Sequence, residues 1–371
     1  MRAFLFDRAG EVLDSGSHAY DTAYPQPGWA EQRPEDWIDA VRGSVKAALS
    51  GAAGADVAGL CAATTSCTVV CCDGDGNALA PAILWMDVRA SAQMYAVLEQ
   101  TGQSISAETF LCKALWIKEN RPDLWASTRV LCEYQDYLNH WLTGEWCFSA
   151  NTACNWGYNN RKKSFDLDFL RAVGLEDMTD KVPARAVSAG EVVGALTAEA
   201  ARALGLPAGI PVVQGGIDSS IGMLGMGTVR PGSLSLMTGS SNLAMAVTEE
   251  PLFVSADAVN SGPDFLLPGY YTSVQGQAAS GSVLRWFRRE FCKDLGMDCL
   301  PELDRAAQAV PSGSGGVLLL DYWQGNRCPH NDPDASGVIA GITMNTTREQ
   351  IYRAVLEGVA YGTRDVLDAF A

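Results

Sequence analysis

The chain has 371 residues, of which 47% are hydrophobic and 19% are charged, so it holds enough apolar material for large cores and too little charge for a disordered protein. It carries 27 basic and 43 acidic residues, a net charge of −16. Because such a chain would repel a phosphate backbone, we expect no nucleic-acid partner. No uncharged apolar stretch reaches the ~18 residues of a membrane span, so we also expect no membrane partner.

Cysteine and histidine usage indicates a reducing compartment and no histidine-based metal site. The eleven cysteines are odd in number, and most lie in apolar runs, as expected of small buried side chains in a reducing compartment. No CxxC pair recurs, and the three histidines are not paired at metal-ligand spacing. The N-terminus has no basic region followed by an apolar segment, so it predicts no secretory signal. We therefore expect a cytoplasmic protein that binds no metal through its own side chains.

The first part of the chain predicts alternating strands and helices. Residues 3–6 and 11–13 flank a short polar turn and predict a β-hairpin. The segment 36–49 has helical periodicity, with Trp37 and Val41 on its apolar face. Further along we expect buried strands over 57–61, 67–72 and 82–85, followed by helices over 88–101, 111–120 and 134–142.

The second part of the chain continues this alternation, which favours the α/β class. Glycine and proline are frequent over 225–234, and we place a domain boundary there, giving domains 1–226 and 227–371. The elements expected in this part are a helix over 197–205 closed by Gly205, a short buried strand over 210–214, a strand over 233–237 and a last helix over 348–370.

One candidate for chemistry is Asp218, which follows a buried strand and two glycines. A carboxylate directly after a strand end, preceded by glycines, can stand where a ligand approaches the backbone closely. On the residues alone two interpretations stay open. Asp218 either caps the following helix, which Ser219 and Ser220 would support, or acts as a general base.

Two turns rich in small residues are candidates for phosphate binding. The turn of Thr238, Gly239 and Ser240 follows a strand, and its N–H groups can cradle a phosphate, although a plain hairpin turn is the commoner structure. The glycine-rich turn at 313–316 lacks the lysine of a P-loop and leads into a strand at 317–320, so we interpret it as a flexible turn.

Several ordered motifs give the chain a resemblance to a known family. The segments 337–342 (GVIAGI) and 350–357 (QIYRAVLE) fit the C-terminal signature of the FGGY carbohydrate kinases at every defined position. The supporting motifs lie at 27–32 and 34–37, at 82–89, at Lys113 with 116–120, and at 325–329. The resemblance covers essentially the whole chain.

This resemblance implies ATP-dependent phosphorylation of a sugar by a fold of two ribonuclease-H-like domains of the actin/hexokinase type, with an interdomain cleft. Asp218 occupies the family's catalytic-base position, where a carboxylate accepts the proton of a sugar hydroxyl as the γ-phosphoryl group arrives. Thr64, Thr65 and Ser219 lie where relatives place sugar contacts. The implied nucleotide contacts are Thr238, Gly239 and Ser240 in the phosphate turn, and Gly281 and Arg285 at a helix start. Mg²⁺ would bridge the ATP phosphates, held mostly by phosphate oxygens and water.

The resemblance favours a ketopentose such as xylulose or ribulose and leaves the sugar open. The segments that look xylulokinase-like are 83–87 and 284–287, and those closer to ribulokinases are 214–218 and 321–327. Val274 lies where ribulokinases often have glutamate. Because Thr64 and Thr65 offer hydroxyls rather than charges, we expect a neutral sugar or polyol as the small-molecule partner.

The chain departs from the family's pattern at both ends. It begins after the strand that carries the family's first phosphate turn, and it stops at Ala371 before the segment that binds adenosine. We therefore expect a fragment with weak nucleotide binding, and the alternative function is a non-catalytic sugar-binding or scaffold fragment that has lost ATP use. The strand 3–6 would then have an unpaired edge, which favours association with other chains, including a homodimer.

Overall fold

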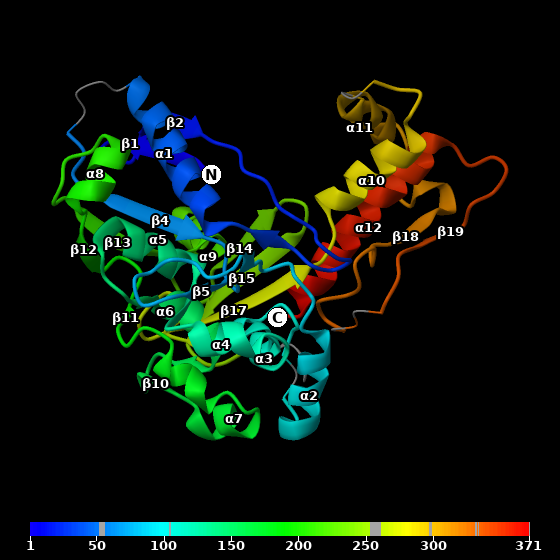
Figure 1. The fold of residues 1–371 in the computed structure, drawn as a ribbon. Helices are drawn as coiled ribbons and strands as arrows, with labels where there is room; N and C mark the ends of the chain where they lie inside the picture. Colours follow the sequence, from blue (N-terminus) through cyan, green and yellow to red (C-terminus); the bar gives the residue numbers. More distant parts are fainter. Residues whose placement is uncertain are drawn as a thin grey trace. The chain divides into compact units, whose positions relative to one another are not determined.

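The computed structural model describes residues 1–51, 56–103, 105–252, 261–296, 299–330, 332 and 334–370. The chain divides into two compact units, Met1–Ile221 and Gly222–Ala371, which we name the N-terminal unit and the C-terminal unit (Figure 1). Each unit combines helices with strands, so the predicted α/β class is confirmed.

The N-terminal unit opens with a β-hairpin on which the first long helix packs. β1 (Arg2–Phe6) and β2 (Val12–Ser17) pair antiparallel, and α1 (Pro34–Ser50) contacts both strands. A Cβ atom at Gly16 would lie 2.2 Å from the carbonyl oxygen of Ser44 in α1, so glycine alone allows this close approach. The predicted hairpin and helix are both confirmed.

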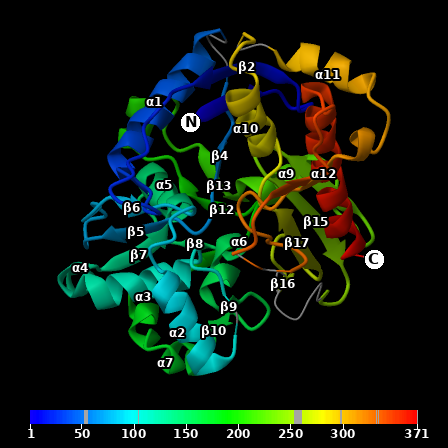
Figure 2. The same cartoon turned by 90° about the vertical axis from the view of Figure 1, so that its right-hand side faces the viewer.

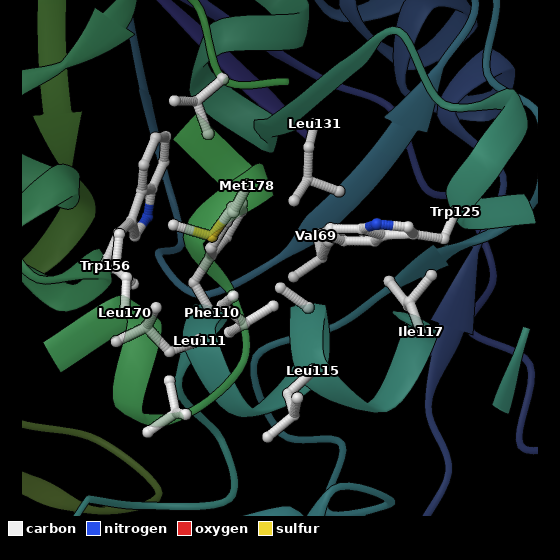
Figure 3. Close-up of a cluster of buried hydrophobic side chains, with 14 of the residues drawn as sticks. Val69, Phe110, Leu111, Leu115, Ile117, Trp125, Leu131, Trp156, Leu170 and Met178 are labelled. Atoms are coloured by element: carbon white, nitrogen blue, oxygen red, sulfur yellow. The ribbon is translucent and has the colours of Figure 1, made fainter. Parts of the chain in front are cut away.

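An antiparallel sheet in the order β3–β6–β5–β7 lies between two hydrophobic clusters of the N-terminal unit. Its strands are β3 (Glu31–Gln32), β5 (Val69–Cys72), β6 (Ala82–Ile83) and β7 (Val130–Glu133). Val69 and Cys71 belong to the cluster that contains Phe110 and Trp156 (Figure 3), whereas Val70 belongs to the cluster around Trp37. Burial on both faces explains why β5 is a continuous apolar run rather than an alternating one.

A second sheet of the N-terminal unit has the order β12–β13–β4. β13 (Pro211–Ile217) pairs antiparallel with β12 (Val192–Ala195) and parallel with β4 (Leu60–Thr64). The sequence predicted a strand over 57–61, and this placement was three residues too early. The register explains the error, because β13 pairs Val212 with Leu60 and Ile217 with Thr64, and the partner strand decides which residues join the ladder.

The remaining elements of the N-terminal unit follow the predicted alternation. α5 (Tyr134–Thr143) contacts both β13 and β4, and Gly205 ends α8 (Ala198–Leu204) in the left-handed conformation, as predicted. The other elements are α2 (Ser91–Thr101), α3 (Phe110–Asn120), α4 (Pro122–Ser127), β8 (Phe148–Ser149), α6 (Ala150–Ala153), η1 (Cys154–Trp156), β9 (Tyr158–Asn159), β10 (Ser164–Phe165), α7 (Leu167–Ala172), η2 (Glu176–Asp180), β11 (Ala186–Val187) and α9 (Asp218–Gly225), which runs into the C-terminal unit.

The C-terminal unit is built on an antiparallel sheet in the order β14–β15–β17–β16. Figure 2 labels β15, β16 and β17 of this sheet. Its strands are β14 (Leu234–Thr238), β15 (Asn242–Thr248), β16 (Ser261–Pro263) and β17 (Tyr271–Gln277). The other elements are α10 (Gly281–Phe291), α11 (Leu300–Gln308), η3 (Ser314–Gly316), the hairpin of β18 (Leu318–Leu320) and β19 (Val338–Ala340), and α12 (Arg348–Asp368). A capping box of Thr347 and Gln350 starts α12. Phe287, Tyr352 and Val355 lie in the core that joins α10 to α12.

The cysteines are unbridged and mostly buried. All eleven are free thiols, and eight of them are buried, so the predicted use of cysteine as a small buried side chain is confirmed. Among the described residues, no helix has both the length and the apolar character needed to span a bilayer.

Candidate active site

The parallel pair β4 and β13 brings two predicted site segments together. Ile217, the last residue of β13, pairs with Thr64, the last residue of β4. The carboxyl ends of two adjacent parallel strands therefore meet at one sheet edge, which is the usual place for a ligand in an α/β sheet. Asp218 and Thr65, the next residues of each chain segment, consequently leave the sheet side by side.

A β-bulge precedes Asp218 and sets its direction. Between Gln214 and Ile217 the register with β4 shifts, so that β13 has one residue more than its partner. A Cβ at Gly215 would lie 1.9 Å from the carbonyl oxygen of Ala62, and one at Gly216 would lie 2.6 Å from Oδ1 of Asn151. The two glycines thus allow close packing against neighbouring protein atoms.

Asp218 is the first residue of α9 and is exposed. Its Oδ1 accepts a hydrogen bond from the backbone N–H of Ser219 at 2.7 Å, whereas a helix-capping side chain accepts from a residue two or three positions further on. Within the described residues the other carboxylate oxygen has no hydrogen-bond partner. This geometry favours an available carboxylate over a cap.

The surroundings of Asp218 also change its basicity. Desolvation by nearby protein atoms raises the pKa of the Asp218 carboxyl above the ordinary range, while the hydrogen bond from Ser219 acts in the opposite direction. A raised pKa strengthens a carboxylate as a proton acceptor near neutral pH.

The turn after β4 presents hydroxyl groups next to Asp218. Thr64 is buried, and its hydroxyl donates to the carbonyl oxygen of Thr65 at 3.0 Å. Thr65 and Ser66 are half-buried. The Ser66 hydroxyl donates to the Cys67 sulfur at 3.3 Å and accepts from the amide of Asn155 at 3.1 Å. The edge therefore carries hydroxyl and amide groups suited to the hydroxyls of a polar ligand.

Sequence reasoning missed Ser66 and Asn155. Ser66 lies in the turn that directly follows β4, and this position alone was enough to include it beside Thr64 and Thr65. Asn155 lies in η1, 89 residues away along the chain, and nothing in its local pattern distinguishes it from a surface asparagine. Ser219, which was predicted, is half-buried in the first turn of α9 beside Asp218.

In the C-terminal unit, the turn after β14 is joined to the start of α10. The backbone N–H groups of Ser280, Gly281 and Ser282 donate to the carbonyl oxygens of Gly239 and Ser240 at 2.9–3.1 Å. A Cβ at Gly281 would lie 2.3 Å from the Gly239 oxygen, so glycine is needed for this contact. The predicted nucleotide segments thus form one continuous surface.

The groups that this surface offers to an anion are side chains and turn amides. The first N–H groups of α10 are already used by the turn, so the helix start itself offers few donors. The hydroxyls of Thr238 and Ser240 are exposed and make no hydrogen bond within the described residues. Arg285 is exposed one turn beyond Gly281 on the same face of α10. Within the described residues, no group of three or more His, Cys, Asp or Glu side chains is arranged to hold a metal ion.

Comparison with known proteins identifies the family. Residues 1–225 match the model of the FGGY family of carbohydrate kinases, N-terminal domain, and residues 234–371 match the model of its C-terminal domain. The chain belongs to the FGGY family of carbohydrate kinases. It is thus a carbohydrate kinase, as the motifs predicted.

The relatives of this FGGY chain include ribulokinases and xylulose kinases. A ribulokinase of Geobacillus thermodenitrificans is 31% identical in an alignment 384 residues long, gaps included, which covers 93% of this chain and 67% of the relative. A xylulose kinase of Escherichia coli is 31% identical in an alignment 377 residues long, gaps included, which covers 99% of this chain and 76% of the relative. The crystal structure of a xylulose kinase from Rhodospirillum rubrum matches with a TM-score of 0.85 at 28% identity, covering 100% of this chain and 77% of that one.

Proposed function

We propose that this FGGY kinase transfers the γ-phosphoryl group of ATP to a hydroxyl of a neutral ketopentose, xylulose or ribulose. The observation that carries the proposal is the pairing of Ile217 with Thr64, because it sets a carboxylate of raised pKa beside a turn of hydroxyl groups. Relatives of nearly equal similarity are named ribulokinase and xylulose kinase, which supports a pentulose without choosing between the two.

In this proposal Asp218 is the general base. A sugar hydroxyl is a weak nucleophile, and the unpaired carboxylate oxygen of Asp218 accepts its proton as the phosphoryl group is transferred. Thr64, Thr65 and Ser219 contact the sugar hydroxyls, and Ser66 joins them. The base follows directly after β13, at the first position of α9 and not on a long loop, and this keeps it in place relative to these groups.

The nucleotide is assigned to the C-terminal unit. Thr238, Gly239 and Ser240 receive the phosphates, and Gly281 and Arg285 line the start of α10 beside them. ATP supplies the phosphoryl group, and Mg²⁺ neutralises its charge while held mostly by phosphate oxygens and water. The exposed hydroxyls and the Arg285 cation fit such a polyanion.

The preference for a neutral sugar follows from charge. The turn 64–66 itself carries hydroxyls rather than charged side chains, and in this proposal the Asp218 carboxylate lies beside it. A sugar acid would bring a second negative charge close to that carboxylate, which is unfavourable in a partly desolvated site.

A substrate panel tests the proposal. ATP consumption is measured with D-xylulose, D-ribulose, L-ribulose, glycerol and gluconate, and we expect one ketopentose to give the highest kcat/KM and gluconate to be inert. A best substrate that carries a carboxylate would contradict the proposal. Calorimetric binding of a ketopentose without ATP consumption would instead support the non-catalytic alternative.

A further inference from the structure

Lys113 is a buried cation that joins three segments around the sugar side of the N-terminal unit. It lies on α3 with a fully buried side chain. Its ammonium donates to the carbonyl oxygens of Cys67 at 2.9 Å, Leu84 at 2.7 Å, Trp85 at 3.1 Å and Glu108 at 2.7 Å. Three protons are thus shared among four acceptors, and the acceptors come from the turn after β4, the segment after β6 and the approach to α3.

Glu133 holds the same turn from the other side. Its side chain is fully buried at the end of β7. One carboxylate oxygen accepts from the backbone N–H of Cys67 at 3.0 Å, and the other accepts from the indole N–H of Trp156 at 2.7 Å. Both backbone groups of Cys67 are therefore bound by buried ionisable side chains, the carbonyl by Lys113 and the N–H by Glu133.

Cys67 has a backbone conformation that needs such support. Its φ angle is 60°, in the left-handed region that non-glycine residues adopt rarely and at a cost. A strained residue persists only where its surroundings determine it, and here two buried side chains do so. Burial of the charged forms of these two groups is itself unfavourable. Burial therefore lowers the pKa of Lys113 and raises the pKa of Glu133 to about 8.

We propose that Lys113 and Glu133 are positioning residues that hold the turn 65–67 in the shape that receives the sugar. The inference rests on the proposed function. The turn starts where Thr64 pairs with Ile217, so its shape decides where Thr65 and Ser66 lie relative to Asp218. We name Lys113 and Glu133 together the clamp on Cys67. Asp218 itself is placed by β13 and does not depend on this clamp.

The proposal predicts that loss of Lys113 changes the KM for the sugar much more than it changes kcat. Lys113→Met keeps the aliphatic chain and removes the N–H donors, so we expect the KM for the sugar to rise about tenfold or more with kcat within about threefold, because uniform binding is lost. Lys118→Met is the matched control. Lys118 lies on the same helix but binds Asp177 and the Gly174 carbonyl, so its loss leaves the sugar KM unchanged.

A second readout does not depend on kinase activity. Cys67 is half-buried, and desolvation, followed by the nearby Glu133 carboxylate, raises the pKa of its thiol to about 11, which slows its reaction with alkylating agents. If Lys113 holds the turn, alkylation of Cys67 followed by peptide mass spectrometry is faster in Lys113→Met by about tenfold and unchanged in Lys118→Met. The loss of the Lys113 charge alone acts the other way, because that charge lowers the pKa of the Cys67 thiol, so faster alkylation reports opening of the turn. A wild-type protein that phosphorylates no ketopentose would contradict the proposed function, while this measurement would still test the clamp.

A rescue experiment distinguishes positioning from general loss of structure. Glycine adopts a positive φ without cost, so Cys67→Gly in the Lys113→Met background recovers part of the sugar affinity, whereas Cys67→Ala does not. If Lys113→Met fails to fold, the near-isosteric Glu133→Gln tests the same turn. Unchanged sugar KM, or unchanged Cys67 reactivity in a folded clamp variant, would overturn the proposal.

Discussion

Asp218 is placed by the bulge of β13, which turns the chain out of the sheet directly before it. The Ile217 N–H donates to Oδ1 of Asn151 at 2.8 Å, which fixes the backbone at this point. The carboxyl group then stands at the first position of α9 with one oxygen bound to the neighbouring N–H. Its partial desolvation, rather than a charged neighbour, accounts for its raised pKa.

The raised pKa of Asp218 predicts the acid side of the pH profile. A base works only when deprotonated, so kcat/KM is retained above the pKa and lost as the pH falls through it. We expect this limb to lie above the ordinary range of an aspartate, about 3.9. Ser219→Ala keeps the backbone N–H that donates to Asp218, so we expect the acid limb to stay in place. The variant loses the Ser219 hydroxyl, a proposed sugar contact, so we expect the sugar KM to rise. A limb at the ordinary aspartate value would contradict the prediction.

The sequence identified Thr64, Thr65 and Asp218 at the sheet edge, and it missed Ser66 and Asn155. Thr64 ends β4, and Thr65 and Asp218 directly follow β4 and β13, so local pattern and family motif both pointed to them. Asn155 reaches Ser66 from a short 3₁₀ helix far along the chain, and only tertiary structure brings it there. The two glycines before Asp218 allow two interpretations from sequence, because a close contact with protein and one with a ligand leave the same signal, and the structure shows the contact with protein.

At the scale of elements, the closeness of β4 and β13 is what sets the site. Gly215 lies against the backbone of Ala62, and the contact leaves no room for a Cβ. The pairing of Ile217 with Thr64 depends on this contact, since both lie within the same parallel ladder. A change at Gly215 therefore acts on stability and on the site together.

We expect Gly215→Ala to lower the free energy of unfolding by about 2–4 kcal/mol, because the added methyl must displace the β4 backbone. It also displaces Asp218 relative to Thr64 and lowers kcat/KM. Gly225→Ala is the matched control, since nothing lies within 4 Å of a Cβ there, and it should change stability by less than about 0.5 kcal/mol. Chemical denaturation compares the variants, and equal stabilities would show that β4 moves freely.

Element boundaries mark the limit of sequence reasoning. The helices over 36–49, 197–205 and 348–370 were close to their observed ends because caps, glycine and periodicity are local signals. The strand predicted over 57–61 lies instead at Leu60–Thr64, and β5 begins at Val69 rather than at 67. In both cases the partner strand or a strained turn, and not residue preference, decides the boundary.

At the scale of the whole molecule, each unit holds one half of the proposed chemistry. The N-terminal unit contains Asp218 and the hydroxyl-rich turn at 64–66, and the C-terminal unit contains the turn at 238–240 with the start of α10. The alternation of strands and helices was enough to predict the class, and the motifs were enough to predict the family. The clamp on Cys67 was beyond both, because it depends on the burial of Lys113 and Glu133.

This division predicts separate footprints for the two ligands. A ligand protects the backbone amides that it orders, so we expect a bound ketopentose to slow hydrogen exchange at the turn after β4 and at the start of α9. MgATP should slow exchange at the turn after β14 and at the start of α10. Hydrogen exchange with mass spectrometry measures both. Protection by MgATP at the turn after β4 alone, with none in the C-terminal unit, would contradict the assignment of the nucleotide.

The central claim is that Asp218 is the base of a sugar kinase, and one comparison tests it most directly. Asp218→Asn keeps the shape of the side chain and removes its ability to accept the proton. We predict that kcat for the best ketopentose falls about 10²–10⁴-fold, while calorimetry shows sugar affinity within about tenfold of the wild type because the turn at 64–66 is intact. Near-normal turnover by the folded variant would contradict the account.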